Sequence, residues 1–244
     1  MGMIRAALLA SCLFSPALTS AKQLVLHGYL NPPYVMQQDY SLGGLWIDII
    51  NHLQSDSEVE LIIELHPLRR AYKLAQTKPN HCVFAIERSQ SREAQFAWVS
   101  PLSISRYALF NADPEQATQP GLSALQGQQI SAHFGSGVAE YLRSFDMDVV
   151  VAKTPEQGAK LLLRERVQVW ASDVLTAAYL RQQLPLPQNG VEFFSSVRSI
   201  ACHPETDKAL LQPLQQSLDA FYQSGGLAKL LQRYEQQYQL SMGL

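Results

Sequence analysis

Apolar and polar positions divide the chain into short strand-like runs and longer helix-like runs that follow one another. Short apolar runs rich in Val, Ile and Leu predict strands at 23–29, 59–65, 82–86, 129–134, 149–151 and 167–171. Apolar positions at helical spacing predict helices that begin near residues 45, 68, 138, 155, 207 and 227. Strands that alternate with helices indicate an α/β fold with mostly parallel sheets.

Two extended runs, 98–110 and 191–202, flank the middle of the chain. The first is followed by Asn111-Ala112-Asp113-Pro114, and the second is preceded by a Pro-rich stretch at 184–190. Such changes in composition are typical of linkers. We therefore expect the chain to cross into a second lobe and to return from it.

The first 21 residues have the features of a secretory leader. Arg5 supplies a positive charge, an apolar stretch follows, and small residues end at Ala21. A second interpretation takes Leu9-Ala10-Ser11-Cys12 as a bacterial lipobox, with Cys12 lipidated. No later run approaches the about 18 apolar residues that span a membrane. We expect a soluble, exported protein from residue 22 onward.

Composition narrows the range of partners. The 244 residues are 47% hydrophobic and 16% charged, an ordinary globular balance that argues against long disorder and coiled coil. The net charge of −2, with scattered Lys and Arg, disfavours nucleic acid as a partner. Removing the leader leaves a net charge of −3 and two cysteines, Cys82 and Cys202. In an oxidising compartment they form a disulfide, or they stay as two buried thiols.

A set of short motifs, in order along the chain, carries a family resemblance. They are Gly44-Leu45-Trp46-Ile47-Asp48-Ile49-Ile50, Pro67-Leu68-Arg69-Arg70-Ala71, Arg88-Ser89-Gln90-Ser91-Arg92 with Phe96 and Trp98, Leu218-Asp219-Ala220-Phe221, and Gly225-Gly226-Leu227-Ala228-Lys229-Leu230 with Tyr234. Together they resemble the extracytoplasmic solute-binding proteins of amino-acid ABC importers, bacterial solute-binding protein family 3. The resemblance covers essentially the whole chain after the leader.

This resemblance implies the two-lobed periplasmic-binding-protein fold of type II. Lobe 1 would comprise 22–105 plus 195–244, and lobe 2 would comprise 106–194, with two hinge crossings. Each lobe would be a mostly parallel sheet flanked by helices. A monomer would close on a small polar solute and present it to an inner-membrane ABC permease. In this fold the strand that starts at Cys82 would lie antiparallel to the run that ends at Cys202.

Arg92 and Asp173 are the two leading ligand candidates. Arg92 matches the family's arginine that grips the ligand α-carboxylate, and a guanidinium suits that task because its planar fork meets two oxygens. Asp173 falls where the family places an acid for the ligand ammonium. A surface arginine and a helix N-cap are the structural alternatives for these two residues.

Ser136 and Glu87 are further candidates. Gly135-Ser136-Gly137 follows a strand and opens a helix, so its amides and hydroxyl would suit a carboxylate or phosphate; a plain turn is the alternative. At the position of Glu87 the family usually has a small hydroxyl residue or glycine, so this carboxylate departs from the family pattern. It would meet a cationic group of the ligand or pair with a nearby arginine.

Four remaining candidates are less specific. Tyr34 and Asn31 flank a Pro-Pro turn at the predicted ligand side of lobe 1, where packing is the alternative role. Arg88 lies close enough to Arg92 to share its role. Arg70 is a cleft candidate or part of a solvated helix face.

Neither a metal site nor a cofactor is expected. The six histidines show no short ligand spacing such as His-x-x-x-His. Besides a non-catalytic binding protein, two functions remain open. One is an enzyme on the same fold that resembles cyclohexadienyl dehydratase, with Glu87 as general acid, and the other is a ligand-sensing subunit of a separate receptor.

Overall fold

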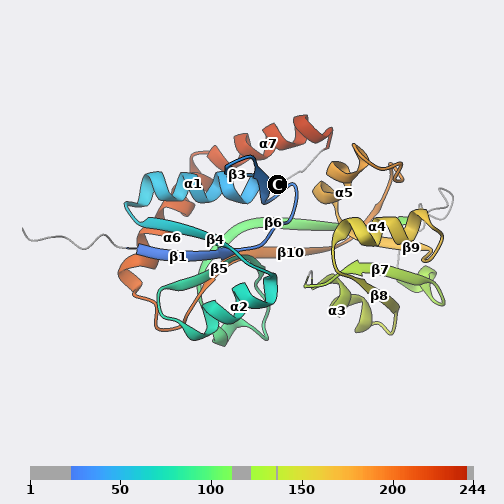
Figure 1. Ribbon diagram of the computed structural model, residues 1–244, viewed down its shortest axis with the longest axis horizontal. Coiled ribbons are helices and arrows are strands. Elements are labelled where there is room, and N and C mark those ends of the chain that lie inside the picture. Colours follow the sequence, from blue (N-terminus) through green and yellow to red (C-terminus); the bar gives the residue numbers. More distant parts are fainter. Residues whose placement is uncertain (1–22, 112–121, 136, 241–244) are drawn as a thin grey trace, which may run out of the picture.

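A single curled sheet of eight strands runs through the protein, with helices on its faces (Figure 1). The computed structural model describes residues 23–111, 122–135 and 137–240, so the predicted leader and Ser136 lie outside the described residues. The order in the sheet is β4-β1-β5-β10-β6-β9-β7-β8. The described strands are β1 (Gln23–Gly28), β2 (Met36–Gln38), β3 (Ser41–Gly43), β4 (Glu60–Leu65), β5 (His81–Glu87), β6 (Ala97–Asn111), β7 (Gln129–His133), β8 (Asp148–Ala152), β9 (Val169–Asp173) and β10 (Val191–Cys202).

Six of the seven described α-helices begin near the positions that the sequence periodicity predicts, and α5 is the one it did not predict. The α-helices are α1 (Leu45–Ser57), α2 (Leu68–Thr77), α3 (Val138–Arg143), α4 (Pro155–Leu163), α5 (Val174–Arg181), α6 (Lys208–Gln223) and α7 (Gly226–Tyr238), and the short 3₁₀ turns are η1 (Glu93–Gln95) and η3 (Leu122–Leu125). Three helices begin at side-chain N-caps: Thr154, Asp173 and Asp207. None of the described helices is long and apolar enough to cross a membrane.

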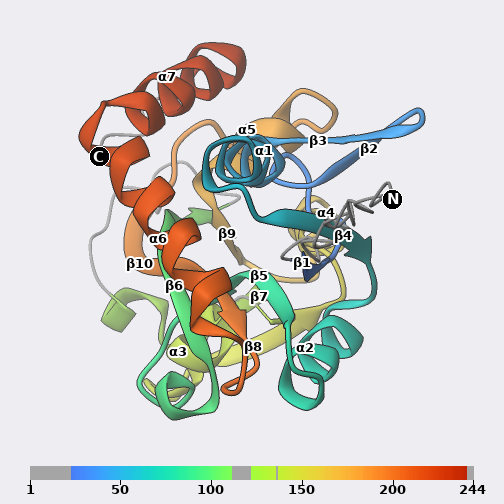
Figure 2. The same cartoon turned by 90° about the vertical axis from the view of Figure 1, so that its left-hand side faces the viewer.

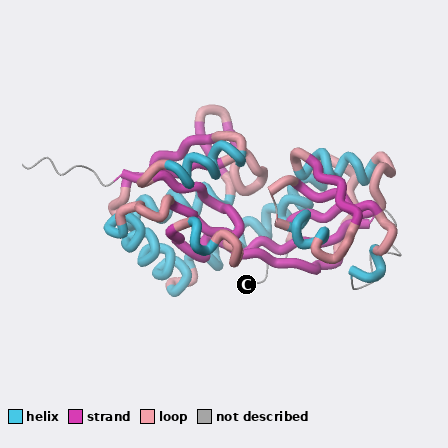
Figure 3. Tube along the Cα trace, turned by 90° about the horizontal axis from the view of Figure 1, so that it is seen from below, coloured by secondary structure: helices cyan, strands magenta, loops and turns pink. Residues whose placement is uncertain are grey.

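Two lobes share the long strands β6 and β10 (Figure 3). Lobe 1 holds the parallel strands β4, β1 and β5, and lobe 2 holds the parallel strands β8, β7 and β9. β6 and β10 pair antiparallel along most of their length and run from one lobe into the other. This arrangement confirms the predicted two-lobed α/β fold with two crossings, while the exact lobe boundaries stay a prediction.

Each lobe has its own apolar core. In lobe 1, helices α1, α6 and α7 cover one face of the sheet and α2 covers the other, as the end-on view of Figure 2 shows. In lobe 2, Ile130 and Leu142 pack on the α3 side and Trp170 and Leu162 pack on the α4 side. Helix α5 of lobe 2 also contributes Leu175 and Ala178 to the lobe 1 core, so this helix and the hinge strands together connect the two lobes.

A turn at residues 31–35 brings Tyr34 to the junction between the lobes. Gly44, with φ of +112°, lets the start of α1 approach this turn, because a Cβ there would lie 2.5 Å from the carbonyl oxygens of Pro33 and Tyr34. The amide of Trp46 donates to the Tyr34 carbonyl at 3.1 Å, and the two rings stack 4.2 Å apart. Tyr34 is therefore fixed by α1. The hairpin of β2 and β3 that follows the turn is not among the elements predicted from the sequence.

Cys82 and Cys202 form a disulfide in the structure. They are register partners in the antiparallel pair of β5 and β10, and both are fully buried. The disulfide therefore joins β5 of lobe 1 to the end of β10, the strand that returns from lobe 2.

Candidate functional site

Three adjoining cavities lie between the lobes, with volumes of about 900, 410 and 20 Å³. All three are lined by Tyr29, and residues of both lobes contribute to each. The shared walls make them parts of one cleft, and the smallest part reaches the hinge strands. We call the side chains at that point the hinge cluster; its members are Tyr34, Ser105, Tyr107, Asp173 and Arg198.

Arg198 is the buried cation of the hinge cluster. It projects from β10, is 3% exposed, and donates to the hydroxyl oxygens of Ser105, at 3.2 Å, and Tyr107. Among the described residues, no carboxylate oxygen lies within 4.0 Å of its guanidinium. A buried guanidinium with only neutral hydroxyl partners is an unfavourable arrangement unless an anion completes it.

Asp173 ends β9 and caps α5. Its Oδ1 accepts from the amides of Leu175 and Thr176, at 3.0 and 3.1 Å, and from the Tyr34 hydroxyl at 2.6 Å. Its other oxygen, Oδ2, is buried and has no hydrogen-bond partner among the described residues. The predicted N-cap role and an additional acceptor position therefore coexist in one carboxylate.

Glu87 and Arg92 flank the cavity of about 410 Å³. Glu87 Oε2 is buried without a hydrogen-bond partner among the described residues, and Arg92 Nη1 lies 3.9 Å from it. Gly137, with φ of +69°, permits this approach across the cleft, because a Cβ there would lie 1.6 Å from Glu87 Oε2. Arg92 Nη2 also lies 3.9 Å from Glu140 Oε2 of lobe 2, so charged groups of the two lobes face each other here.

Burial controls the protonation of both carboxylates. It raises the pKa of Asp173, although hydrogen bonds from Tyr34 and Thr176 and the charge of Arg198 offset part of the effect. Burial also raises the pKa of Glu87, and Arg198 and Arg92 counter it only in part. A cationic group that reached either free oxygen would favour the ionised form.

Of the other predicted site residues, some line the cavities and some do not. Asn31 lines two of the three cavities, in agreement with a position near a ligand. Arg88 is paired with Glu93 and lies over the Trp98 ring, and it lines none of the three. Arg70 is exposed and lines none either, whereas its neighbour Arg69 lines two cavities and lies over the Phe134 ring of lobe 2.

Sequence reasoning missed Arg198 and His133. His133 ends β7 and lines two cavities, and burial lowers its pKa to about 4, so its ring is neutral at pH 7. The available signal for Arg198 was a charged residue inside the extended run 191–202, between Val197 and a stretch of small and apolar residues. A charge within a buried strand is uncommon and marks a functional position more often than a packing position.

No protein-family model matches the sequence, and no curated protein matches it. Solved structures do match. A mutant of the arginine-binding protein of T. maritima is 18% identical with a TM-score of 0.73, over 87% of this chain and 95% of that chain. The GluR0 ligand-binding core in complex with L-glutamate is 14% identical with a TM-score of 0.75, over 88% of this chain and 99% of that chain.

A third match is an ancestral amino acid-binding protein, a precursor of cyclohexadienyl dehydratase. It is 14% identical with a TM-score of 0.74, over 87% of this chain and 95% of that chain. The chain has the two-lobed periplasmic-binding-protein fold. In this periplasmic-binding-protein fold, β6 and β10 are the hinge strands, and the hinge cluster lies at the base of the interlobe cleft.

Proposed function

We propose that the protein binds a small α-amino acid or related carboxylate in the interlobe cleft, without chemical turnover. The observation that carries this proposal is Arg198, a guanidinium 3% exposed whose described partners are two hydroxyl groups. Glu87 and Asp173 act on Arg198 from beyond ion-pair distance, and a ligand carboxylate would supply a direct negative partner that accepts two N–H bonds from the planar fork.

The unpartnered oxygens of Asp173 and Glu87 support a zwitterionic ligand. Asp173 Oδ2 and Glu87 Oε2 are acceptors in the same cleft as the Arg198 donor. A ligand ammonium that donates to Asp173 Oδ2 satisfies one of them, and a second cationic or N–H group satisfies Glu87. Arg92 remains a candidate for a second carboxylate contact, because it borders the cavity of about 410 Å³.

The structural matches agree with this ligand class. Their names record binding proteins for arginine and an L-glutamate complex, although identities of 14–18% establish only the fold. By analogy we further propose a monomer that is exported to the periplasm and delivers its ligand to an inner-membrane ABC permease. In a variant of this proposal, the protein presents its ligand to a separate receptor and not to a permease. One of the matched structures is a histidine kinase sensor domain.

Glu87 favours a second candidate function, an enzyme on the same fold. Its buried oxygen and raised pKa are properties of a general acid. The matched precursor of cyclohexadienyl dehydratase belongs to this candidate. Incubation of the protein with each bound compound separates the two functions, because a binding protein returns the compound unchanged and an enzyme consumes it.

The test begins with mass spectrometry of small molecules released from the denatured purified protein, followed by thermal unfolding with a panel of amino acids and carboxylates. A ligand at about 100 times its dissociation constant adds roughly 2.7 kcal/mol. At this chain length about 1 kcal/mol moves the melting temperature by roughly 2–4 °C, so a shift of roughly 5–10 °C is expected. A panel with no shift, and no released amino acid or carboxylate, contradicts the proposal.

A further inference from the structure

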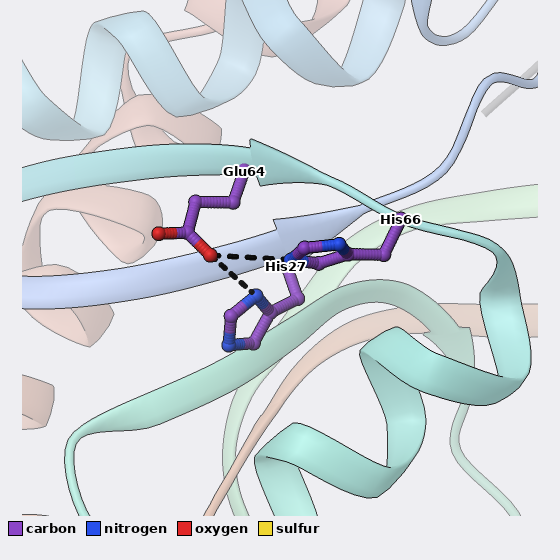
Figure 4. Close-up of side chains that lie close together, drawn as sticks. All are labelled: His27, Glu64 and His66. Carbon is purple, nitrogen blue, oxygen red and sulfur yellow. Dashed lines mark hydrogen bonds and ion pairs between the residues drawn. The ribbon is translucent and has the colours of Figure 1, made fainter.

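Two histidines and a glutamate meet on lobe 1, away from the hinge cluster (Figure 4). His27 lies on β1, Glu64 lies on β4, and His66 follows the end of β4. Parallel pairing makes His27 and Glu64 register partners, and the amide of His66 donates to the carbonyl oxygen of Gly28 at 2.9 Å. The backbone thus fixes all three positions.

The side-chain atoms are spaced as metal ligands are. Glu64 Oε2 lies 3.5 Å from His27 Nδ1 and 3.1 Å from His66 Nε2, and all three atoms lie within 4.8 Å of one another. Two ligands on a tetrahedral zinc ion, each about 2.0–2.2 Å from the metal, lie about 3.3–3.6 Å apart. The spacing of 3.5 Å between His27 Nδ1 and Glu64 Oε2 fits this value, and a small rotation of the part-exposed His66 ring would adjust the other two spacings.

His27 provides an independent observation. It is 1% exposed, and its Nδ1 is buried without a hydrogen-bond partner among the described residues. Its other nitrogen, Nε2, lies 2.8 Å from Nδ1 of His81. When Nε2 carries the ring proton and donates it to His81, Nδ1 keeps a free lone pair for a metal ion. Metal-bound histidines usually donate a hydrogen bond from their other ring nitrogen in this way.

We propose that His27 Nδ1, Glu64 Oε2 and His66 Nε2 bind a divalent transition-metal ion of the Zn²⁺ class. Two imidazoles and a carboxylate are a known zinc donor set, and three protein ligands leave a fourth position for water or another donor. The ion has access, because the Glu64 side chain is 49% exposed and His66 also lines the largest cavity. His81 is a positioning residue that holds the His27 ring.

This inference departs from the sequence expectation of no metal site. His27 and His66 are far apart in the sequence, so they do not form a short motif of metal ligands. The parallel pairing of β1 and β4 brings them together. Two of the three proposed metal ligands, His27 and Glu64, line none of the three cavities, and His66 borders only the cavity of about 900 Å³, so the metal site adjoins the proposed ligand cleft at its edge.

Calorimetric titration of the metal-free, untagged protein with Zn²⁺ tests the site. We expect one ion per chain and binding weakened more than about tenfold by Glu64→Gln, whose side chain is 49% exposed, and by His66→Ala, whose side chain is 17% exposed. Circular dichroism of the metal-free variants establishes that both are folded. His81→Ala should weaken binding by about 10–100-fold through the His27 ring. His203→Ala is the matched control, because His203 lies outside the cluster, and it should bind as the unchanged protein does.

Titration with Co²⁺ adds a spectroscopic readout, since a four-coordinate site gives an intense visible absorption that His66→Ala should remove. Absence of saturable one-to-one binding overturns the proposal. So does Zn²⁺ binding that His66→Ala and Glu64→Gln leave intact, or that His203→Ala reduces as much as they do.

Discussion

The Tyr34 hydroxyl donates a hydrogen bond of 2.6 Å to Asp173 Oδ1. This bond joins a turn of lobe 1 to the N-cap residue of α5 in lobe 2. Both side chains are buried, at 4% and 6% exposure. One carboxylate therefore caps a helix, links the lobes and keeps a second oxygen free toward the cleft.

Tyr34→Phe removes this link while it keeps the ring that stacks on Trp46. Hydrogen bonds to charged groups contribute about 1.5–3 kcal/mol, so the unliganded protein should unfold at a temperature several degrees lower. Thermal unfolding followed by circular dichroism measures the shift. Tyr40→Phe is the control, because Tyr40 is fully exposed, and an equal effect of the two substitutions would show that the link is unimportant.

Glu87 should give the stability of the unliganded protein a distinct pH dependence. Its pKa is raised above 4.5 by burial, so the folded protein binds the proton more tightly than the unfolded chain does. Ionised Glu87 therefore costs stability at neutral pH, and this cost disappears as the pH falls through the folded pKa toward 4.5. The stability of the unchanged protein relative to Glu87→Gln should rise over that window.

Denaturant unfolding of the two proteins at several pH values between neutrality and 4.5 measures this difference. Glu60→Gln serves as the matched control, because Glu60 is exposed on β4 and lines none of the three cavities. If the stability of the unchanged protein relative to Glu87→Gln stays constant with pH, or rises toward neutral pH, Glu87 is not a buried carboxylate that costs stability.

The disulfide between Cys82 and Cys202 should stabilise the fold. It closes a loop with a sequence separation of 120, for which the chain-entropy model gives at most about 5 kcal/mol. Reduction, or the double substitution Cys82→Ala with Cys202→Ala, should lower the melting temperature markedly. Thiol titration of denatured, unreduced protein without the leader should find no free thiol, and two free thiols would exclude the bond.

Local patterns along the chain predicted most elements because hydrophobic periodicity directly records which face of a helix or strand is buried. Tyr34 was named from a rigid turn, and Asp173 from the family resemblance at the end of a strand. The structure places both in the hinge cluster, and their role toward a ligand stays a prediction. Arg70 was the expected cleft candidate on this helix, but Arg69 lines two of the cavities and Arg70 lines none of the three.

Other site features depend on long-range pairing that no local pattern contains. Arg198 acquires its hydroxyl partners only when β10 pairs with β6, which carries Ser105 and Tyr107. The metal-ligand candidates His27 and His66 likewise meet only through the pairing of β1 with β4. Sequence reasoning therefore centred the carboxylate contact on Arg92, and the structure adds Arg198 as the more deeply buried candidate.

We propose above all that Arg198 binds the ligand carboxylate. Calorimetric titration of arginine variants with the ligand released from the protein tests this most directly. Arg198→Lys keeps the charge but loses the planar fork, and Arg198→Met loses both; circular dichroism and the unliganded melting temperature establish that each is folded. Truncating one partner of a buried charge pair costs about 2–5 kcal/mol, so Arg198→Met should bind about 30-fold more weakly or worse. Arg198→Lys should fall between.

Arg92→Ala and the exposed Arg70→Ala complete the series. The account predicts a large loss of affinity for Arg198→Met, a smaller loss for Arg92→Ala and unchanged affinity for Arg70→Ala. A folded Arg198→Met protein that binds the ligand with the affinity of the unchanged protein would contradict it.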